Sequence, residues 1–193
     1  YAYTGEDGQS SVELAVDPEK SGNTGNALLN SQAVYPYDEN VVVKYEDNMD
    51  KIELTYPTTQ KYGVNSFGKE ANIMVAAGKH NSDDNLYFRN ACGYLIIKLY
   101  GQGTNEQPTT IKSITLSSVS GVDKIAGKAV IVAKHDAAPV ITMADDASTA
   151  VTLDCNVDDV GVALGADAEH ATEFWFCLPP VTFTDGIKIT VTD

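Results

Sequence analysis

Short runs of alternating apolar and polar residues follow one another along most of the chain. Clear examples are Val12–Val16, Lys51–Thr55, Ile111–Leu116 and Ile187–Val191. Because successive side chains of a strand point to opposite faces, this period of two predicts strands with one buried face. Further strands are predicted at Ala33–Tyr37, Val41–Tyr45, Ile73–Ala77, Leu86–Asn90, Tyr94–Tyr100, Ala129–Ala133, Val140–Met143, Ala150–Asp154 and Thr172–Leu178.

Segments rich in Gly, Asn, Asp and Pro separate these strands, because such residues tolerate positive φ or preset a turn. The 3.6-residue period of a helix is rare, and short helices are candidates only at Ser21–Ser31 and Asp158–Ala171. Many short strands joined by turns predict an all-β protein, either one β-sandwich or a pair. Gly78–Asn85 carries no apolar residue, which predicts two domains at residues 1–82 and 83–193.

Composition narrows the class of partner. The 193 residues are 43% apolar, which is enough to bury a core and argues against wholesale disorder. The net charge of −14 argues against a nucleic-acid partner, because binding to a phosphate backbone needs clustered cations. Arg89 is the sole arginine, so a clamp of several arginines is excluded.

Both ends of the chain have strand-like sequence and no recognisable targeting segment. No signal peptide opens the sequence, and no run approaches the ~18 apolar residues of a membrane helix. We therefore expect a processed or truncated chain.

Three cysteines, Cys92, Cys155 and Cys177, form an odd set with no CxxC pair. The favoured interpretation is that all three are buried thiols acting as small apolar groups. A single Cys92–Cys155 disulfide and a catalytic thiol remain as alternatives.

Motifs that carry catalysis or bind cofactors are absent. The sequence lacks GxSxG, HExxH, a P-loop and GxGxxG. His80, His135 and His170 lie in polar segments, so a histidine site would need three distant loops to converge. The pairs Asp83-Asp84, Asp145-Asp146 and Asp158-Asp159 lack EF-hand spacing and are read as a solvated acidic surface, with weak calcium binding as the alternative. We expect no enzyme, no cofactor and no resident metal.

One aromatic segment is a candidate ligand site. In Glu173–Leu178, alternation places Phe174, Phe176 and Leu178 on one face and Glu173, Trp175 and Cys177 on the other. A strand that is apolar on both faces is more often central and covered on both sides, which favours a structural Trp175. The alternative is that Trp175 forms a platform for a sugar ring at a domain interface.

An ordered series of segments extends through the chain. In the second half these segments are Phe88–Leu95, Ile96–Gly101, Ile111–Leu116, Ile125–Ala129, Val151–Cys155, Gly161–Leu164, Phe174–Pro180, Phe183 and Gly186–Asp193. In the first half they are Tyr3–Gly8 and Ala33–Tyr37. In its order and spacing the series resembles the fimbrillin-like (Mfa-like) family of Bacteroidetes surface proteins, and the resemblance covers nearly the whole chain. It implies contact with a membrane only through a lipid anchor that is absent from this chain.

The resemblance implies two tandem transthyretin-like (Greek-key) β-sandwich domains, the first lacking its first strand. It also implies export as an outer-membrane lipoprotein, display at the cell surface or in a fimbria, and service as a pilus subunit or related adhesin. In the pilin branch, proteolysis after Arg or Lys removes the first strand, and a neighbour's strand fills the groove. Arg89 does not fit that cleavage site, because it lies in mid-chain beside a strand.

Strand exchange is physically reasonable here, because a sandwich lacking a strand exposes unpaired backbone groups. Ile187, Ile189 and Val191 are the candidate exchange edge, although the favoured interpretation of their alternation is an ordinary paired strand. Expected partners are other pilus subunits, and a host or bacterial surface protein or glycan. The alternative function is a surface carbohydrate-binding lipoprotein; an enzyme comes third.

Overall fold

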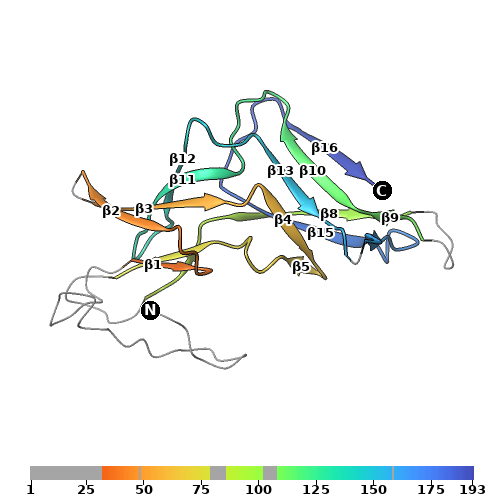
Figure 1. The fold of residues 1–193 in the computed structure, drawn as a ribbon, viewed down its shortest axis with the longest axis horizontal. Coiled ribbons are helices and arrows are strands. Elements are labelled where there is room, and N and C mark those ends of the chain that lie inside the picture. Colours follow the sequence, from red (N-terminus) through yellow and green to blue (C-terminus); the bar gives the residue numbers. More distant parts are fainter. Residues whose placement is uncertain (1–31, 48, 79–85, 102–107, 158) are drawn as a thin grey trace.

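The computed structural model describes residues 32–47, 49–78, 86–101, 108–157 and 159–193 (Figure 1). Every regular element in these residues is a strand, which confirms the predicted all-β class. The predicted strand Val12–Val16 and the candidate helix Ser21–Ser31 lie outside the described residues. The strands are β1 Gln32–Tyr35, β2 Val42–Glu46, β3 Met49–Tyr56, β4 Thr59–Gly63, β5 Ser66–Phe67, β6 Met74–Ala77, β7 Arg89–Asn90, β8 Gly93–Leu99, β9 Thr110–Ile111, β10 Ser113–Ser118, β11 Gly127–Val132, β12 Val140–Met143, β13 Ala150–Asp154, β14 Val162–Ala163, β15 Thr172–Leu178 and β16 Ile187–Thr192.

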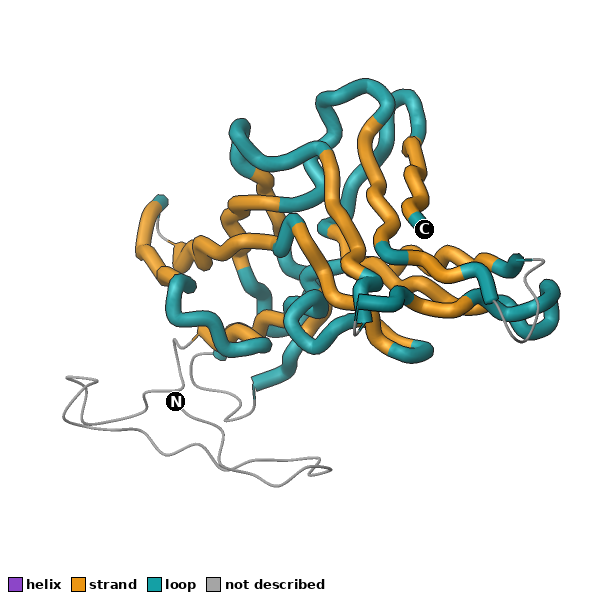
Figure 2. Tube along the Cα trace, turned by 45° about the vertical axis from the view of Figure 1, so that its right-hand side comes forward, coloured by secondary structure: helices purple, strands orange, loops and turns teal. Residues whose placement is uncertain are grey.

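A five-stranded sheet in the order β16-β10-β13-β4-β5 forms one layer of the larger core. Its strand β10, which lies between β16 and β13, alternates as predicted, with Ile114 and Leu116 fully buried. The β13–β4 pair is parallel, and all other pairs in this sheet are antiparallel. Figure 2 shows β16, β10 and β13 running side by side next to the C-terminal end.

The antiparallel pair β8–β15 supplies the facing layer of this first core. Phe174 and Phe176 of β15 are fully buried and pack with Ile114, Leu116 and Leu153. The ring of Phe174 also lies 5.6 Å from that of Tyr62 in β4, centroid to centroid. Apolar faces from two layers therefore close over each other, which is the arrangement of a β-sandwich.

A second core is built from residues of the four-stranded sheet β12-β11-β3-β2, the three-stranded sheet β1-β6-β7 and neighbouring segments. Its buried members include Ile52, Tyr56, Val75 and Ile131. Tyr56 donates its hydroxyl to the carbonyl oxygen of Ala91 at 2.5 Å, and burial raises its pKa. The tyrosine thus stays neutral and ties β3 to the segment before β8.

Strands from both halves of the chain share sheets. β11 pairs with β3, from Gly127 opposite Tyr56 to Ile131 opposite Ile52. β13 pairs with β4, from Thr152 opposite Thr59 to Asp154 opposite Lys61. The predicted domain boundary between residues 82 and 83 lies outside the described residues.

The candidate helix at Asp158–Ala171 is wrong in its described part. Residues 159–171 contain turns and β14, which pairs with β9. The Asp167 side chain accepts the backbone N–H groups of Glu169 and His170 at 3.0 Å each. Such local hydrogen bonds compete with the backbone hydrogen bonds of a helix, so this segment forms a polar turn instead.

Candidate functional site

The final strand, β16, forms one edge of the five-stranded sheet. It pairs with β10 along its whole length, and no other described strand pairs with its outer side. Figure 1 places β16 at the outside of the fold, next to the chain's C-terminal end. The candidate exchange residues Ile187, Ile189 and Val191 therefore belong to a paired strand that is also an open edge.

The apolar side chains of β16 lie at the rim of the first core. Ile189 is opposite Leu116 and Val191 opposite Ile114, so these pairs share the core-facing side of the sheet. Leu116 and Ile114 are fully buried, whereas Ile189 is 47% and Val191 42% exposed. The core thus covers β10 but leaves the neighbouring apolar row half in solvent.

The open backbone groups of β16 belong to the same three residues. Val119 donates its N–H to the carbonyl oxygen of Gly186 at 3.1 Å, which marks these two as a hydrogen-bonded pair. Hydrogen-bonded pairs alternate along an antiparallel ladder. With this register, Lys188, Thr190 and Thr192 point their N–H and C=O groups toward β10. Ile187, Ile189 and Val191 point theirs outward.

A buried carboxylate anchors the segment that leads into β16. Oδ2 of Asp123 accepts the hydroxyls of Ser118 at 2.6 Å and Ser120 at 2.7 Å, and the backbone N–H of Thr184 at 3.2 Å. Oδ1 accepts the Thr184 hydroxyl at 2.8 Å. These bonds, led by the two serine hydroxyls, lower the pKa of Asp123 to about 2. The network ties the end of β10 to the residues just before β16.

Replacing Asp123 with asparagine is expected to reduce the acid sensitivity of folding. The folded-state pKa lies below the ~3.9 of an unfolded aspartate, so its contribution to stability is complete above about pH 4 and is lost as pH falls toward 2. Asparagine cannot titrate, and it accepts fewer of the bonds. The urea concentration at the unfolding midpoint should therefore drop further between neutral and acid pH for wild type than for Asp123→Asn. Asp146→Asn, at an exposed turn position, is the control and should retain the wild-type slope.

The face of β8–β15 that is turned away from the first core carries a row of aromatic rings. Phe67 stacks on Tyr94 with centroids 5.2 Å apart and planes 7° apart, and Tyr94 lies 6.3 Å from Trp175. Tyr94 is 43% exposed, and Trp175 is half-buried. The sequence singled out Trp175 but not its two aromatic neighbours, which come from other strands.

Polar groups border this row. Trp175 Nε1 donates to Glu173 Oε2 at 3.0 Å, and Lys98 Nζ lies 2.6 Å from Glu173 Oε1. The Lys98 hydrogen bond, followed by that of Trp175, lowers the pKa of Glu173 and keeps it ionised. The Tyr94 hydroxyl donates to Asn72 Oδ1 at 3.0 Å. Flat aromatic surface beside hydrogen-bonding groups suits a ring that carries hydroxyls.

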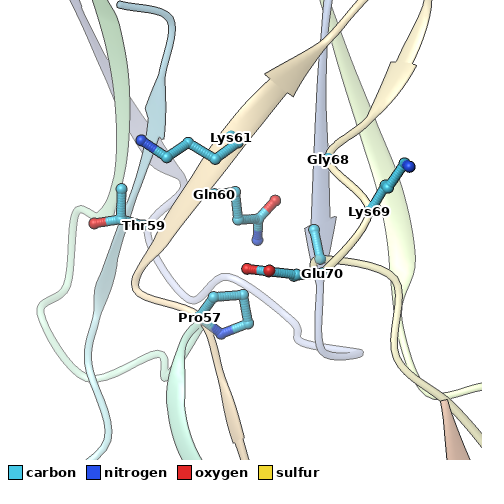
Figure 3. A pocket seen from close by; sticks show the side chains of 8 residues that line it. Pro57, Thr59, Gln60, Lys61, Gly68, Lys69 and Glu70 are labelled. Atoms are coloured by element: carbon cyan, nitrogen blue, oxygen red, sulfur yellow. The ribbon is translucent and has the colours of Figure 1, made fainter. Parts of the chain in front are cut away.

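A pocket of about 420 Å³ lies between β4 and the segment Gly68–Ala71 (Figure 3). In the figure, Gln60, Glu70 and Pro57 lie around the opening, and Lys61 and Lys69 extend away in opposite directions. Lys61 is engaged with Asp154 Oδ2 at 2.5 Å. The lining contains no histidine or cysteine, so it lacks the usual proton-transfer base and thiol nucleophile.

Gln60, on the wall of this pocket, has a structural task that sequence reasoning missed. It is buried; its Nε2 donates to the carbonyl oxygen of Cys177 at 2.7 Å, and its Oε1 accepts the N–H of Cys177 at 3.0 Å. The amide imitates a neighbouring strand and joins β4 to β15. No local pattern in Thr59–Tyr62 signals this partner 117 positions away.

All three cysteines are free and buried, which confirms the favoured interpretation of them as buried thiols. Cys155 lies in the first core, whereas Cys92 lies in the second, and the Cys92–Cys155 disulfide is not formed. Burial raises the pKa of Cys155 to about 12, helped by the neighbouring Asp154 carboxylate. Its thiolate is therefore scarce at neutral pH, which disfavours it as a nucleophile.

The other candidate ligands are dispersed or lie outside the described residues. His135 follows β11, and His170 pairs with Asp167 in the turn before β15. Asp145-Asp146 is an exposed turn; His80, Asp83-Asp84 and Asp158 are not described. Among the described residues no group of three or more His, Cys, Asp or Glu side chains is placed to hold a metal ion.

Arg89 is held by the fold rather than presented as a cleavage site. Its Nη2 donates to the carbonyl oxygen of His135 at 3.1 Å, and its side chain is half-buried.

In the part of the chain that the structure describes, no helix has the length and apolar content needed to cross a membrane. In comparisons with known proteins, no family model, curated protein or solved structure matches this chain.

Proposed function

We propose that this chain is a non-enzymatic cell-surface adhesion protein, a fimbrillin-like pilus subunit or stalk component that joins its neighbours by strand addition at β16. The observation that carries the proposal is the coincidence of an open edge with a half-exposed apolar row, Ile187, Ile189 and Val191. The ordered resemblance to the fimbrillin-like family supplies the class of assembly.

Strand addition would satisfy both features of the edge at once. An incoming strand would pair with the outward N–H and C=O groups of the three residues and extend the sheet by one strand. Its alternate apolar side chains would lie beside Ile189 and Val191 on the core side. Removing these half-exposed side chains from water supplies the hydrophobic part of the driving force.

The proposed partners and location follow from the same assignment. Other subunits occupy the β16 edge, and a lipid anchor attaches the assembly to the outer membrane. The tandem transthyretin-like sandwiches belong to this proposal, with the five-stranded sheet and β8–β15 as the layers of one sandwich. The net charge of −14 suits an exposed surface and disfavours nucleic acid.

The test uses the full-length precursor exported in its native cell. Surface-displayed protein is cleaved with a trypsin-like protease, and the products are examined for SDS-resistant ladders. We expect a ladder from wild type and none from Ile189→Lys/Val191→Lys, because two buried ammonium groups would oppose the incoming strand.

The matched control is Thr190→Lys/Thr192→Lys, which adds the same charges to the opposite face of β16. It should retain the ladder. A wild-type protein that stays monomeric after cleavage would refute strand-exchange assembly for this chain.

A second candidate function is glycan binding at the aromatic face. The stacked Phe67–Tyr94 pair beside Trp175, bordered by Glu173 and Lys98, favours it. Binding of the wild-type protein on a glycan array, lost in Trp175→Ala but kept in the exposed-ring control Phe88→Ala, would support this function. Loss of the SDS-resistant ladder in the β16 variants with glycan binding intact would separate the two activities.

A further inference from the structure

Two buried thiols meet where β15 passes between the two cores. Phe174, Phe176 and Leu178 of β15 face the first core, while Cys177 faces the second. Cys177 is opposite Tyr94 in the ladder, and Cys92 comes two residues before Tyr94, immediately before the start of β8. Both side chains are buried in the second core, and their proximity lowers the pKa of Cys92 and raises that of Cys177. Both thiols thus share one buried site.

Neighbouring groups hold this site in place. Cys92 Sγ lies 3.1 Å from Asn72 Oδ1. The Gln60 side-chain amide hydrogen-bonds to both the backbone N–H and the backbone C=O of Cys177. Cys155 lies in the other core, with its sulfur 3.7 Å from the carbonyl oxygen of Leu153. The three thiols therefore divide into one adjacent pair and one isolated member.

We propose that Cys92 and Cys177 form an intramolecular disulfide when the folded protein meets a disulfide oxidant, and that Cys155 remains a thiol. Two thiols that are buried in the same core at neighbouring positions of the β8–β15 pairing are placed to approach each other and reach the ~2.05 Å of an S–S bond. The cross-link would tie the start of β8 to the end of β15 and constrain the unfolded chain. The proposal is independent of the proposed function, although a protein displayed outside the cell meets such oxidants.

The reaction proceeds by thiol–disulfide exchange. Cys92, 7% exposed, is more accessible than Cys177, 1% exposed, so its thiolate attacks one sulfur of oxidised glutathione. An S–S bond to Cys92 forms, and one glutathione thiolate leaves. The Cys177 thiolate then attacks the Cys92 sulfur and displaces the second glutathione. Two protein thiols are oxidised, one glutathione disulfide is reduced, and the two protons end on the released thiols.

The test counts thiols in the folded, reduced chain before and after incubation with oxidised glutathione. Samples are acid-quenched, denatured, labelled with a maleimide and weighed by mass spectrometry. Wild type should fall from three free thiols to one with no glutathione adduct, and Cys155→Ser from two to none. Cys92→Ser should keep both remaining thiols, whereas Cys177→Ser, which lacks the second attacking thiol, should stop at a glutathione adduct on Cys92.

Peptide mapping of oxidised wild type needs no variant and should recover Cys92 linked to Cys177. Retention of all three thiols in folded wild type would overturn the proposal. So would recovery of Cys155 in the disulfide. The oxidised protein should also unfold at a higher urea concentration than the reduced protein, a shift that Cys177→Ser should abolish.

Discussion

Replacing Phe174 with alanine is expected to lower the free energy of unfolding by about 4 kcal/mol. Phe174 is fully buried in the first core, and its ring packs against Tyr62 at 5.6 Å. Truncation removes the buried ring and leaves a cavity between β15 and β4, two strands whose pairing partners hold them in place. The cavity cannot collapse easily, so the cost lies toward the upper end for such changes.

Urea denaturation followed by circular dichroism measures this loss. Phe88→Ala is the matched control, because Phe88 is 44% exposed and its truncation should cost well under half as much. Equal losses for the two variants would contradict the placement of the first core between β15 and the five-stranded sheet.

Replacing Gln60 with leucine is expected to cost about 3 kcal/mol, although leucine has a similar size. The substitution removes the two hydrogen bonds to Cys177 and leaves its buried N–H and C=O without the amide partner. Each such buried group carries its own desolvation penalty. Gln60→Glu should also destabilise, because a carboxylate cannot donate to the Cys177 carbonyl oxygen.

The control for Gln60 is Gln32→Leu, the same change at a half-buried position in β1. Within the described residues, Gln32 makes one long contact, Nε2 to Asp50 Oδ2 at 3.4 Å, so its loss should cost under about 1 kcal/mol. Amide exchange at Cys177 gives a second readout, since its N–H should lose protection in Gln60→Leu. Unchanged stability and protection would contradict the link between β4 and β15.

Strands with regular alternation could be predicted from the sequence. Ile111–Leu116, Ala150–Asp154 and Thr172–Leu178 all correspond to observed strands, because one face of each had to reach a core. β4 was missed because Thr59, Lys61 and Gly63 surround Gln60 with no apolar alternation. Leu86–Asn90 was predicted too long: only Arg89–Asn90 forms a strand, because β6 pairs with those two residues alone.

The candidate edge was visible in the sequence only as an apolar period of two. Alternation at Ile187, Ile189 and Val191 predicts a strand, but it does not say whether a neighbour covers its outer side. That depends on strand order, which places β16 beside β10, some seventy residues earlier in the chain. The Asp123–Thr184 tie, which spans 61 positions, is hidden for the same reason.

Residue-resolved amide exchange along β16 tests strand addition most directly. In monomeric protein, the inward amides of Lys188, Thr190 and Thr192 should exchange slowly and the outward amides of Ile187, Ile189 and Val191 quickly. In the protease-assembled species, the three outward amides should slow by roughly tenfold or more, because each gains a partner in the incoming strand. Outward amides that stay as fast in the assembled species as in the monomer would contradict strand addition at β16.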